Sequence, residues 1–454
     1  MFIDTHAHLF YPNFNEDVDE VINRAKDAGV HCIIVPATDI ESSHKVIKLV
    51  EKYDFIYGAV GIHPHDTTNW QNSIIDEISE LANHEKIVAI GEIGLDYFYD
   101  FSPKEKQIAA FKAQIDLALK INKPIIVHTR DSDDDMMNVI RTYKNSGLKA
   151  QFHCFNGTLQ NAKELVRLNH FISFTGNITF KKSDNLRDIA ANLSLESIML
   201  ETDSPFMTPE PFRGKRNEPA NVKLVAEKLA AIHHLNVEDV ARLTSYNVFR
   251  MFGIGSKPGG INFTYKIGES LYINVTNRCD ANCEFCDREG DAILNGYSLS
   301  MSKSDEPEAT TYIKEIGDPK QYKEIVFCGY GEPTIRWDVV KIIAKSVKEM
   351  GGRTRLITNG HGNIINRRDI VPELKDLIDI VSISFNSPDA RQYSELMGLE
   401  IQYYDEMKNF AKEAMKYVEK VVMTAIAMDE INIENAKKIV EKEIGVEFRV
   451  RQYF

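Results

Sequence analysis

The sequence predicts an α/β protein made of a closed (β/α)8 barrel followed by a partial, open (β/α)6 barrel. Short runs of β-branched residues alternate with helix-length amphipathic stretches along the chain, which is the pattern of parallel β/α units. The chain has 454 residues, more than the roughly 250–300 at which a single hydrophobic core stops growing. Residues 253–260 (GIGSKPGG) are rich in glycine, a composition that supports neither helix nor strand. We therefore expect one domain at 1–255, a linker at 256–261 and a second domain at 262–454.

The first domain contains eight candidate strands, each a short apolar run bounded by polar or turn residues. They cover residues 2–9, 31–38, 56–64, 87–96, 124–130, 149–155, 171–178 and 197–205. Alternating strands and helices form right-handed crossovers, and eight such units in about 255 residues match a closed barrel. A helix at 237–252 is expected to complete the domain.

Six side chains of metal-binding type fall at the expected C-terminal ends of these strands, where barrel enzymes place their catalytic groups. They are His6, His8, Glu92, His128, His153 and Asp203. Imidazole and carboxylate groups suit Mg²⁺, Mn²⁺, Zn²⁺, Fe²⁺ or Co²⁺, and six of them are too many for one tetrahedral ion. Any single histidine would more simply hydrogen-bond within the barrel. The whole set predicts two divalent ions, an arrangement that stabilises the attacking and leaving oxygens of a phosphoester displacement.

Seven motifs in the first 255 residues are similar to those of the TatD family. They are DTHAH (4–8), GIHPH (61–65), GEIGLDY (91–97), IVHTR (126–130), HCFNG (153–157), ETDSP (201–205) and PFRGKRNEP (211–219). The resemblance implies a metal-dependent hydrolase barrel with magnesium- or manganese-supported deoxyribonuclease activity, often 3′-to-5′ and at DNA ends. A nucleic acid or a nucleotide-derived molecule is then the expected substrate.

The same resemblance implies roles for individual residues. One ion would be held by His6, His8, Glu92 and Asp203, and the other by Glu92, His128 and His153, so that Glu92 bridges the two. Asp203 would also orient or deprotonate the attacking water. Four further side chains are expected to contact substrate phosphates, although ordinary loop hydrogen bonds would also explain them. They are His63, His65, Arg213 and Arg216.

The second domain repeats the alternation with six candidate strands. They cover residues 271–278, 324–333, 354–360, 379–387, 420–428 and 446–454. Six strand–helix units are too few for the usual eight-stranded ring and therefore predict an open barrel.

Three cysteines lie in one loop after the first of these strands. Cys279, Cys283 and Cys286 have C-x3-C-x2-C spacing, so three thiolates can surround one Fe–S cluster and leave one iron without a protein ligand. Zinc is an alternative that needs a fourth ligand, for which His361 or Cys328 is available. Three free thiols are the other alternative.

The surroundings of this loop resemble those of radical S-adenosylmethionine enzymes over nearly all of 262–454. Phe285 precedes the last cysteine, the next strand ends in GYGEP (329–333), and the one after ends in TNG (358–360). Tyr330 departs from the glycine common in that turn. The resemblance implies a [4Fe–4S] cluster that cleaves S-adenosylmethionine reductively, with electrons from an external flavodoxin- or ferredoxin-like donor.

The resemblance also implies a set of residues in contact with S-adenosylmethionine. They are Gly329, Gly331 and Glu332 for the methionyl amine, Phe285 for the adenine, and Ser384 and Asn386 for the ribose. Glycine allows a close approach of the backbone. The two ribose contacts are the weaker assignments, because a polar residue at a strand end often serves only as a cap.

The composition of the chain limits which partners the protein is expected to bind. The net charge is −13, which argues against tight, non-specific binding of duplex DNA. It leaves a nuclease open, because bound divalent cations bring their own positive charge. The sequence contains no apolar run of the roughly 20 residues that a membrane helix needs, and it begins without a basic leader. We expect a cytoplasmic protein that does not bind membranes.

The expected function is that of a bifunctional enzyme, with a hydrolase and a radical domain that act on related, nucleotide-derived substrates. Two alternatives stay open. The same ligand set activates water against carbonyl carbon, so the barrel could hydrolyse a C–N or lactone bond. In the other alternative, one domain is a non-catalytic docking module for its neighbour.

Overall fold

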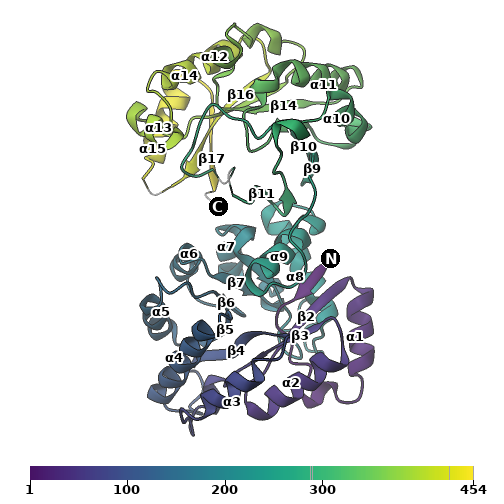
Figure 1. Ribbon diagram of the computed structural model, residues 1–454, viewed down its shortest axis with the longest axis vertical. Coiled ribbons are helices and arrows are strands. Elements are labelled where there is room, and N and C mark those ends of the chain that lie inside the picture. The colour runs from purple at the N-terminus through teal and green to yellow at the C-terminus, as the bar shows by residue number, and fades with distance from the viewer. Residues whose placement is uncertain (287, 289, 429, 453–454) are drawn as a thin grey trace. The chain divides into compact units, whose positions relative to one another are not determined.

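A computed structural model describes residues 1–286, 288, 290–428 and 430–452. The chain forms two compact units, Met1–Lys257 and Pro258–Phe454 (Figure 1), and each has its own hydrophobic core. Among the described residues, no helix is both long and apolar enough to cross a lipid bilayer.

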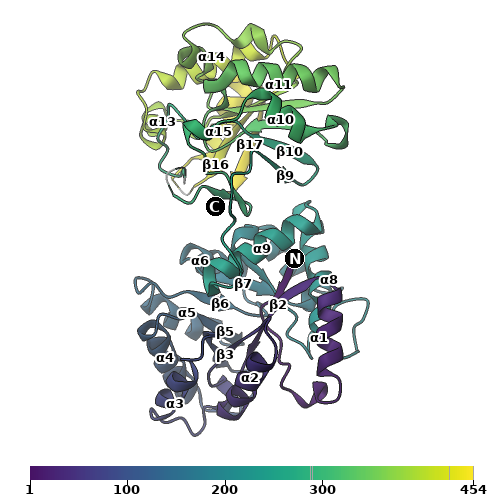
Figure 2. The ribbon, with the colours of Figure 1, turned by 45° about the vertical axis from the view of Figure 1, so that its right-hand side comes forward.

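The first unit is an eight-stranded parallel sheet in the order β1 to β8, with helices around the outside (Figures 1 and 2). The strands are β1 (Phe2–Asp4), β2 (Val30–Pro36), β3 (Ile56–Val60), β4 (Ile87–Asp96), β5 (Ile125–Arg130), β6 (Ala150–Phe152), β7 (Phe171–Phe174) and β8 (Ile198–Leu200). The α-helices are α1 (Val18–Asp27), α2 (Ile40–Lys52), α3 (Ile74–Leu81), α4 (Lys104–Lys120), α5 (Asp133–Thr142), α6 (Leu159–Arg167), α7 (Asp184–Ala191), α8 (Val222–His233) and α9 (Val237–Phe252). The predicted (β/α)8 architecture is confirmed.

Contacts between the first and last strands close this sheet into a barrel. The Thr5 amide donates to the Leu200 carbonyl at 3.0 Å, and Ala7 forms a parallel bridge with Ser204. The buried Asp4 carboxylate accepts hydrogen bonds from the amide of Thr202 at 2.9 Å and from its hydroxyl at 2.6 Å. Residues near the start of the unit are thereby fixed against residues that follow β8.

Local sequence signals set where several helices begin and end. Asp39 and Ser42 form a capping box at the start of α2, in which each side chain accepts from the backbone of the other. Asn236 caps α9 by accepting from the amide of Asp239. The same helix ends at Gly253, which adopts the left-handed conformation that glycine tolerates best.

The second unit is a seven-stranded sheet in the order β17-β16-β15-β14-β13-β10-β9. Six strands are parallel, namely β10 (Ser270–Asn274), β13 (Ile325–Cys328), β14 (Thr354–Thr358), β15 (Ile380–Ser384), β16 (Lys420–Ala427) and β17 (Glu447–Gln452). The α-helices are α10 (Ala309–Ile316), α11 (Trp337–Glu349), α12 (Gly362–Asn366), α13 (Ala390–Met397), α14 (Tyr403–Ala414) and α15 (Ile433–Lys438). The predicted partial (β/α)6 barrel is confirmed.

The second unit also contains strands that the sequence analysis did not predict. An antiparallel edge strand, β9 (Thr264–Ile267), pairs with β10. A short hairpin joins β11 (Ile293–Leu294) to β12 (Tyr297–Ser298). These strands have two to four residues, too few for an apolar pattern of period two to stand out.

Side chains of the second sheet alternate between two environments, as the strand period requires. Phe327, Leu356 and Val381 are fully buried in the core that the helices complete. On the alternate positions, Arg355 donates from Nη1 to the Ser382 hydroxyl at 3.0 Å. The face of the sheet away from the helices is therefore polar in part.

Candidate active sites

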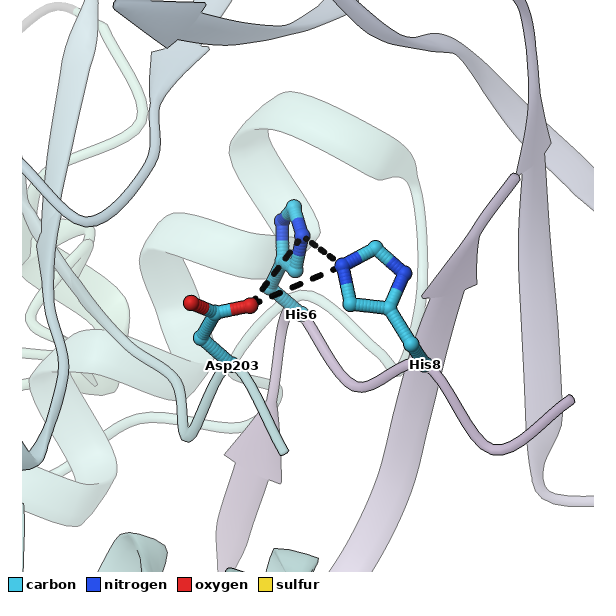
Figure 3. A group of neighbouring side chains, drawn as sticks. All are labelled: His6, His8 and Asp203. Atoms are coloured by element: carbon cyan, nitrogen blue, oxygen red, sulfur yellow. Dashed lines mark hydrogen bonds and ion pairs between the residues drawn. The ribbon is translucent and has the colours of Figure 1, made fainter. Parts of the chain in front are cut away.

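His6 and His8 meet Asp203 at the mouth of the first barrel (Figure 3). The two Nε2 atoms lie 3.1 Å apart, and Asp203 Oδ1 lies 3.5 Å from His8 Nε2 and 4.0 Å from His6 Nε2. All three residues are at least nine-tenths buried. The sequence analysis placed both histidines on the first strand, but β1 ends at Asp4 and they lie in the segment beyond it.

Glu92 connects this group to a second one. Its Oε2 atom lies 3.3 Å from His6 Nε2 and 3.5 Å from His8 Nε2. Its Oε1 atom lies 2.9 Å from His128 Nδ1 and 2.7 Å from His153 Nε2. Each oxygen of one carboxylate therefore faces a separate pair of imidazoles, and the six predicted ligands converge on one place.

The local shape of β4 positions the Glu92 side chain. The pairing of β4 with β5 is irregular between Ile90 and Ile93, and an irregularity of this kind redirects a side chain. The sequence analysis placed Glu92 at the C-terminal end of the strand predicted at 87–96, which was wrong. β4 continues to Asp96, so Glu92 lies inside the strand.

The hydrogen bonds of the outer imidazole nitrogens indicate how metal ions would fit. His8 Nδ1 lies 3.1 Å from the Pro36 carbonyl, and His128 Nε2 lies 3.0 Å from Asp96 Oδ2. Each of these nitrogens is the donor, so the other nitrogen of a neutral ring turns a lone pair toward Glu92. Lone pairs and carboxylate oxygens that face one another at about 3 Å are a donor set suited to divalent cations. The residues present fit the expected ions.

The charges in this cluster depend on burial and on close pairs. Burial alone would raise the pKa of Glu92, but the surrounding imidazoles, with His153 first, hold it well below its usual range. Burial and the neighbouring His153 lower the pKa of His6 to about 3. Burial would lower the pKa of His128, but its hydrogen bonds to Asp96 and Glu92 raise it to about 9. Glu92 is therefore ionised, His6 is neutral and His128 is protonated, and an ion that binds His128 Nδ1 would displace its proton.

Asp96 is a functional residue that the sequence analysis missed. It is buried, and its Oδ2 atom lies 2.9 Å from His65 Nε2 and 3.0 Å from His128 Nε2. Its Oδ1 atom accepts from the amides of Phe98 at 2.9 Å and Tyr99 at 3.2 Å. Its position at the end of a strand was the available signal.

Glu201 is a second carboxylate that was missed. It is fully buried, and its oxygens lie 4.0 Å from His6 Nδ1 and 4.0 Å from His153 Nδ1. Neither of these nitrogens has a hydrogen-bond partner among the described residues. Burial raises the pKa of Glu201 well above its usual range. It lies behind the ligands, on the side away from Glu92.

Two of the four residues expected to contact phosphates lie close to the ligands. His63 Nε2 is 3.5 Å from Glu92 Oε1, and His65 is bound to Asp96. Both histidines line a cavity of about 880 Å³ that also exposes Glu92, His128 and other ligands.

The two arginines of that set are placed differently. Arg216 donates two hydrogen bonds to Asp17, at 2.6 and 2.7 Å. The Arg213 guanidinium lies 4.0 Å from the centre of the Phe180 ring. Neither arginine is among the described residues that line the cavity. The Arg216 guanidinium, which was expected to contact a substrate phosphate, is already paired with the Asp17 carboxylate.

In the second unit, the cysteine loop runs alongside the end of α13. The amide of Asn282 donates to the Met397 carbonyl at 2.9 Å, and that of Glu284 donates to the Leu396 carbonyl at 3.0 Å. Burial raises the pKa of Cys283 to about 12, and the pKa of Cys279 is raised equally. Thiols in such a setting become thiolates when a metal centre supplies positive charge.

Asp280, inside the cysteine loop, begins a chain of hydrogen bonds. It accepts from Asn359 Nδ2 at 2.6 Å and pairs with His361 Nδ1 at 2.8 Å. His361 Nε2 in turn lies 3.0 Å from the hydroxyl of Tyr393, a buried residue of α13. Both nitrogens of His361 are engaged, so it does not serve as a fourth zinc ligand. Among the described residues, no three thiols lie within single-ion distance of one another.

The GYGEP turn packs against the backbone that leads into the cysteine loop. A side chain at Gly331 would come within 2.4 Å of the Thr276 carbonyl and 2.3 Å of the Arg278 carbonyl. Gly329 has a φ of +139°, a conformation open mainly to glycine. A side chain at either position would therefore distort this turn, whether or not the glycines also approach a cofactor.

Glu332 has a different environment from the one expected. Its carboxylate is buried and accepts hydrogen bonds from the Thr358 hydroxyl and the Asn359 amide, each at 2.8 Å. It also accepts from the amide of Thr334 at 3.0 Å. These bonds hold the turn against the end of β14 and leave little capacity for a methionyl amine.

The remaining expected cofactor contacts lie at the end of β15, just after it, or in the cysteine loop. Asn386 is buried, and its Oδ1 atom has no hydrogen-bond partner among the described residues. The Ser384 hydroxyl lies 3.5 Å from Arg451 Nη2. Phe285 packs against the core of the unit. An unpaired buried acceptor at a strand end fits a ligand that supplies hydroxyl or amine donors.

Comparison with known proteins assigns both units. The model of the TatD related DNase family matches residues 3–253, and that of the Radical SAM superfamily matches residues 273–442. The chain is 41% identical over 254 residues to the uncharacterized metal-dependent hydrolase YabD of Bacillus subtilis, covering 56% of this chain and 100% of that protein. It is 34% identical over 260 residues to the 3′-5′ ssDNA/RNA exonuclease TatD of Escherichia coli, covering 55% of this chain and 98% of that protein.

A solved structure agrees with the assignment of the first unit. The crystal structure of YJJV, a TatD homolog from Escherichia coli, has a TM-score of 0.53 and 33% sequence identity, with 56% of this chain and 98% of that chain covered. Both units are thus of enzymatic type. The chain belongs to the TatD related DNase family and carries, after its hydrolase barrel, a radical SAM domain.

Proposed function

We propose that the barrel is a two-metal phosphodiesterase that acts on nucleic-acid ends, and that the second unit cleaves S-adenosylmethionine reductively at a [4Fe–4S] cluster. One observation carries the first part: the two oxygens of Glu92 face separate imidazole pairs, at 2.7–2.9 Å on one side and 3.3–3.5 Å on the other. A bridging carboxylate is what a close pair of ions requires. The relative named as a 3′-5′ ssDNA/RNA exonuclease supports the choice of nucleic acid.

In the barrel, the chain's own residues orient the reactants. Two divalent ions held by the six ligands would supply Lewis acidity at the attacking and leaving oxygens. Asp203 lines the cavity and accepts a proton from the attacking water. His63 lies beside Glu92 and donates to a phosphate oxygen. Asp96 fixes the ring orientation of His128.

In the second unit, the residues hold and surround the cofactors. A [4Fe–4S] cluster on Cys279, Cys283 and Cys286 would supply the electron for cleavage of S-adenosylmethionine. Asn386 offers its unpaired Oδ1 atom to a ribose hydroxyl. An external flavodoxin- or ferredoxin-like protein supplies the reducing equivalent. The two domains would act on related, nucleotide-derived substrates in the cytoplasm.

The barrel proposal is tested with the full chain, Mn²⁺ or Mg²⁺, and end-labelled oligonucleotides. We expect products one nucleotide shorter at each step, and a loss of more than about a hundredfold in kcat/KM for Glu92→Ala, a larger effect than the 10–100-fold typical of residues behind the ligands. Glu164→Ala, on the outer helix α6, is the matched control and should retain activity. Turnover of an amide or lactone panel without phosphodiester cleavage would replace this proposal with carbonyl hydrolysis.

The radical proposal is tested anaerobically on the reconstituted full chain. We expect four irons per chain, an EPR signal altered by S-adenosylmethionine, and release of 5′-deoxyadenosine after dithionite reduction. Cys283→Ala should abolish all three, whereas Cys328→Ser, outside the loop, should retain the cluster. Zinc in place of iron would contradict the proposal, and full activity of Cys283→Ala would show that the loop is not the site.

A further inference from the structure

The loop between β4 and α4 exposes three aromatic side chains beside the barrel cavity. Phe98, Tyr99 and Phe101 are 52%, 41% and 59% exposed. Single exposed apolar residues are ordinary, but contiguous exposed apolar groups at the edge of a functional cavity mark a binding surface. Phe98 and Tyr99 line the cavity that contains the metal ligands.

These rings form one continuous surface, the aromatic rim. Tyr99 and Phe101 are stacked, with centroids 5.1 Å apart and ring planes 16° from parallel, and Phe98 meets Tyr99 edge-on at 4.7 Å. The guanidinium of Arg130, the last residue of β5, lies 3.7 Å from the centre of the Phe98 ring. A flat apolar surface with an attached cation suits a planar ring that carries a phosphate.

Hydrogen bonds through one buried carboxylate connect the aromatic rim to the metal ligands. Asp96 accepts from the amides of Phe98 and Tyr99 through one oxygen and lies 3.0 Å from His128 Nε2 through the other. His65, on the same carboxylate, lies edge-on to Tyr99 at 5.5 Å and to Phe101 at 4.8 Å. The distance from the ligands to the rim is therefore set by one buried group and not by a loose loop.

A second apolar group lines the cavity from the segment after β8. Phe206 and Met207 are 52% and 39% exposed and line the same cavity. Phe206 meets Tyr11 edge-on at 5.8 Å. In a closed ring of eight strands, β4 and β8 are four positions apart, so the two apolar groups lie on different sides of the mouth.

We propose that the aromatic rim is a base-stacking subsite, which holds an unpaired nucleobase of the substrate beside the phosphate that the metal site receives. The inference rests on the proposed phosphodiesterase function and specifies its substrate. A base can lie flat on Tyr99, which lines the cavity, only when it has left its partner strand, because paired bases stack on one another inside the duplex.

The neighbouring charges favour this occupant over an apolar protein segment or a lipid surface. Arg130 adds a cation to the rim, and the metal site requires an anionic group within the same cavity. A nucleotide supplies both parts, a planar ring and a phosphate, in one covalent unit. Stacking of this kind is tolerant of sequence, because every base has a π-face.

The test compares two oligonucleotides that differ only in whether their 3′-terminal nucleotides carry bases or are abasic. Wild-type full-length protein with Mn²⁺ should cleave the base-containing strand about tenfold or more faster in kcat/KM. The double variant Phe98→Ala/Tyr99→Ala should lose this preference, so that it cleaves the two strands at nearly equal rates. Phe212→Ala is the matched control: this ring is 42% exposed but does not line the cavity.

A binding measurement with Mg²⁺ makes the test independent of turnover. Fluorescence of 2-aminopurine near the 3′ end should be quenched by wild type and by Phe212→Ala, but not by the double variant. Equal quenching by all three proteins, or equal loss of both cleavage rates in a folded double variant, would overturn the subsite. Failure of wild type to cleave either strand would instead overturn the proposed phosphodiesterase activity. The fluorescence quenching would still show whether a base stacks on the aromatic rim.

Discussion

Glu92 and Asp96 lie four residues apart on β4, yet one faces the donor cluster and the other lies behind it. Asp96 pairs with His128 and His65 through one oxygen and with the loop backbone through the other. Partners of this kind usually fix the tautomer of a metal-binding histidine and raise its basicity. Asp96 is therefore expected to govern metal affinity without touching the metal.

We expect Asp96→Asn to weaken Mn²⁺ binding by about 10–100-fold. The amide keeps the shape of the carboxylate but has no charge and can accept through only one atom. Isothermal titration of the metal-free protein with Mn²⁺ measures the effect. Asp116→Asn, on the outer helix α4, is the matched control, because the exposed Asp116 carboxylate accepts from the Tyr143 hydroxyl at 3.0 Å. Wild-type affinity in Asp96→Asn would leave the residue with a purely structural role.

For individual residues, side-chain type and position at a predicted strand end were enough to identify the six side chains that converge in the barrel. Asp96 was missed because Glu92 was taken as the ligand at the end of its strand, although the predicted range 87–96 already ended at Asp96. Glu201 was missed because burial, not residue type, distinguishes it. Arg216 pairs with Asp17 across 199 positions, a contact that sequence spacing does not reveal.

Among the elements, α13 supports the cysteine loop twice. It accepts two backbone hydrogen bonds from the loop, and its Tyr393 is the last residue in the series of hydrogen bonds that starts at Asp280. We expect His361→Ala to destabilise the second unit by about 2–3 kcal/mol, because it leaves the Asp280 carboxylate and the Tyr393 hydroxyl without this partner. We also expect the reconstituted protein to lose iron faster.

Thermal unfolding of the cluster-free protein and iron retained after gel filtration measure the two effects. Tyr393→Phe is the graded control, because it removes only the last link of the chain. The reduction potential of the cluster and its EPR line shape in reconstituted His361→Ala protein provide the contrary outcome. If both match wild type, the hydrogen bonds that run from Asp280 to Tyr393 do not position the cysteine loop.

The junction of α11 with β14 and β15 depends on Asp379. Burial would raise its pKa, but the hydrogen bonds from Lys348 Nζ at 2.6 Å and the Thr354 amide at 2.7 Å lower it. Because the folded pKa lies below the unfolded one, the stabilisation is present above about pH 4 and is lost as pH falls through the folded pKa.

We expect Asp379→Asn to lower the free energy of unfolding by about 1 kcal/mol at pH 7, after allowance for solvent screening. The difference in the free energy of unfolding between this variant and wild type should be constant between about pH 5 and 8 and should shrink below about pH 4. Urea unfolding at several pH values measures it, with the exposed Asp376→Asn as control. A difference that grows in acid would contradict the assignment.

The order of parallel elements followed from the alternation of apolar runs, whereas the short antiparallel pieces did not. β9 has four residues, and each strand of the β11–β12 hairpin has two. Such strands are formed by pairing with a neighbour and not by their own pattern. The support of the cysteine loop by α13 was likewise hidden, because the two segments are separated by over a hundred residues.

On the scale of the whole molecule, the two units have separate cores. We expect scanning calorimetry of the full chain to resolve two transitions, of which Mn²⁺ raises only the one that belongs to the barrel. The Glu92→Ala variant identifies that transition, because its midpoint should no longer respond to Mn²⁺. A single transition that shifts as a whole would show that the units unfold together.

The closure of the barrel has a consequence for how the protein is made. The Thr202 amide donates to Asp4 across 198 positions, and His6 meets Asp203 at the same seam. A growing chain therefore carries its first two imidazoles for most of the synthesis of the barrel before their acidic partner has left the ribosome. An ion held by His6, His8, Glu92 and Asp203, as proposed, could therefore reach its full ligand set only after residue 203 has been made.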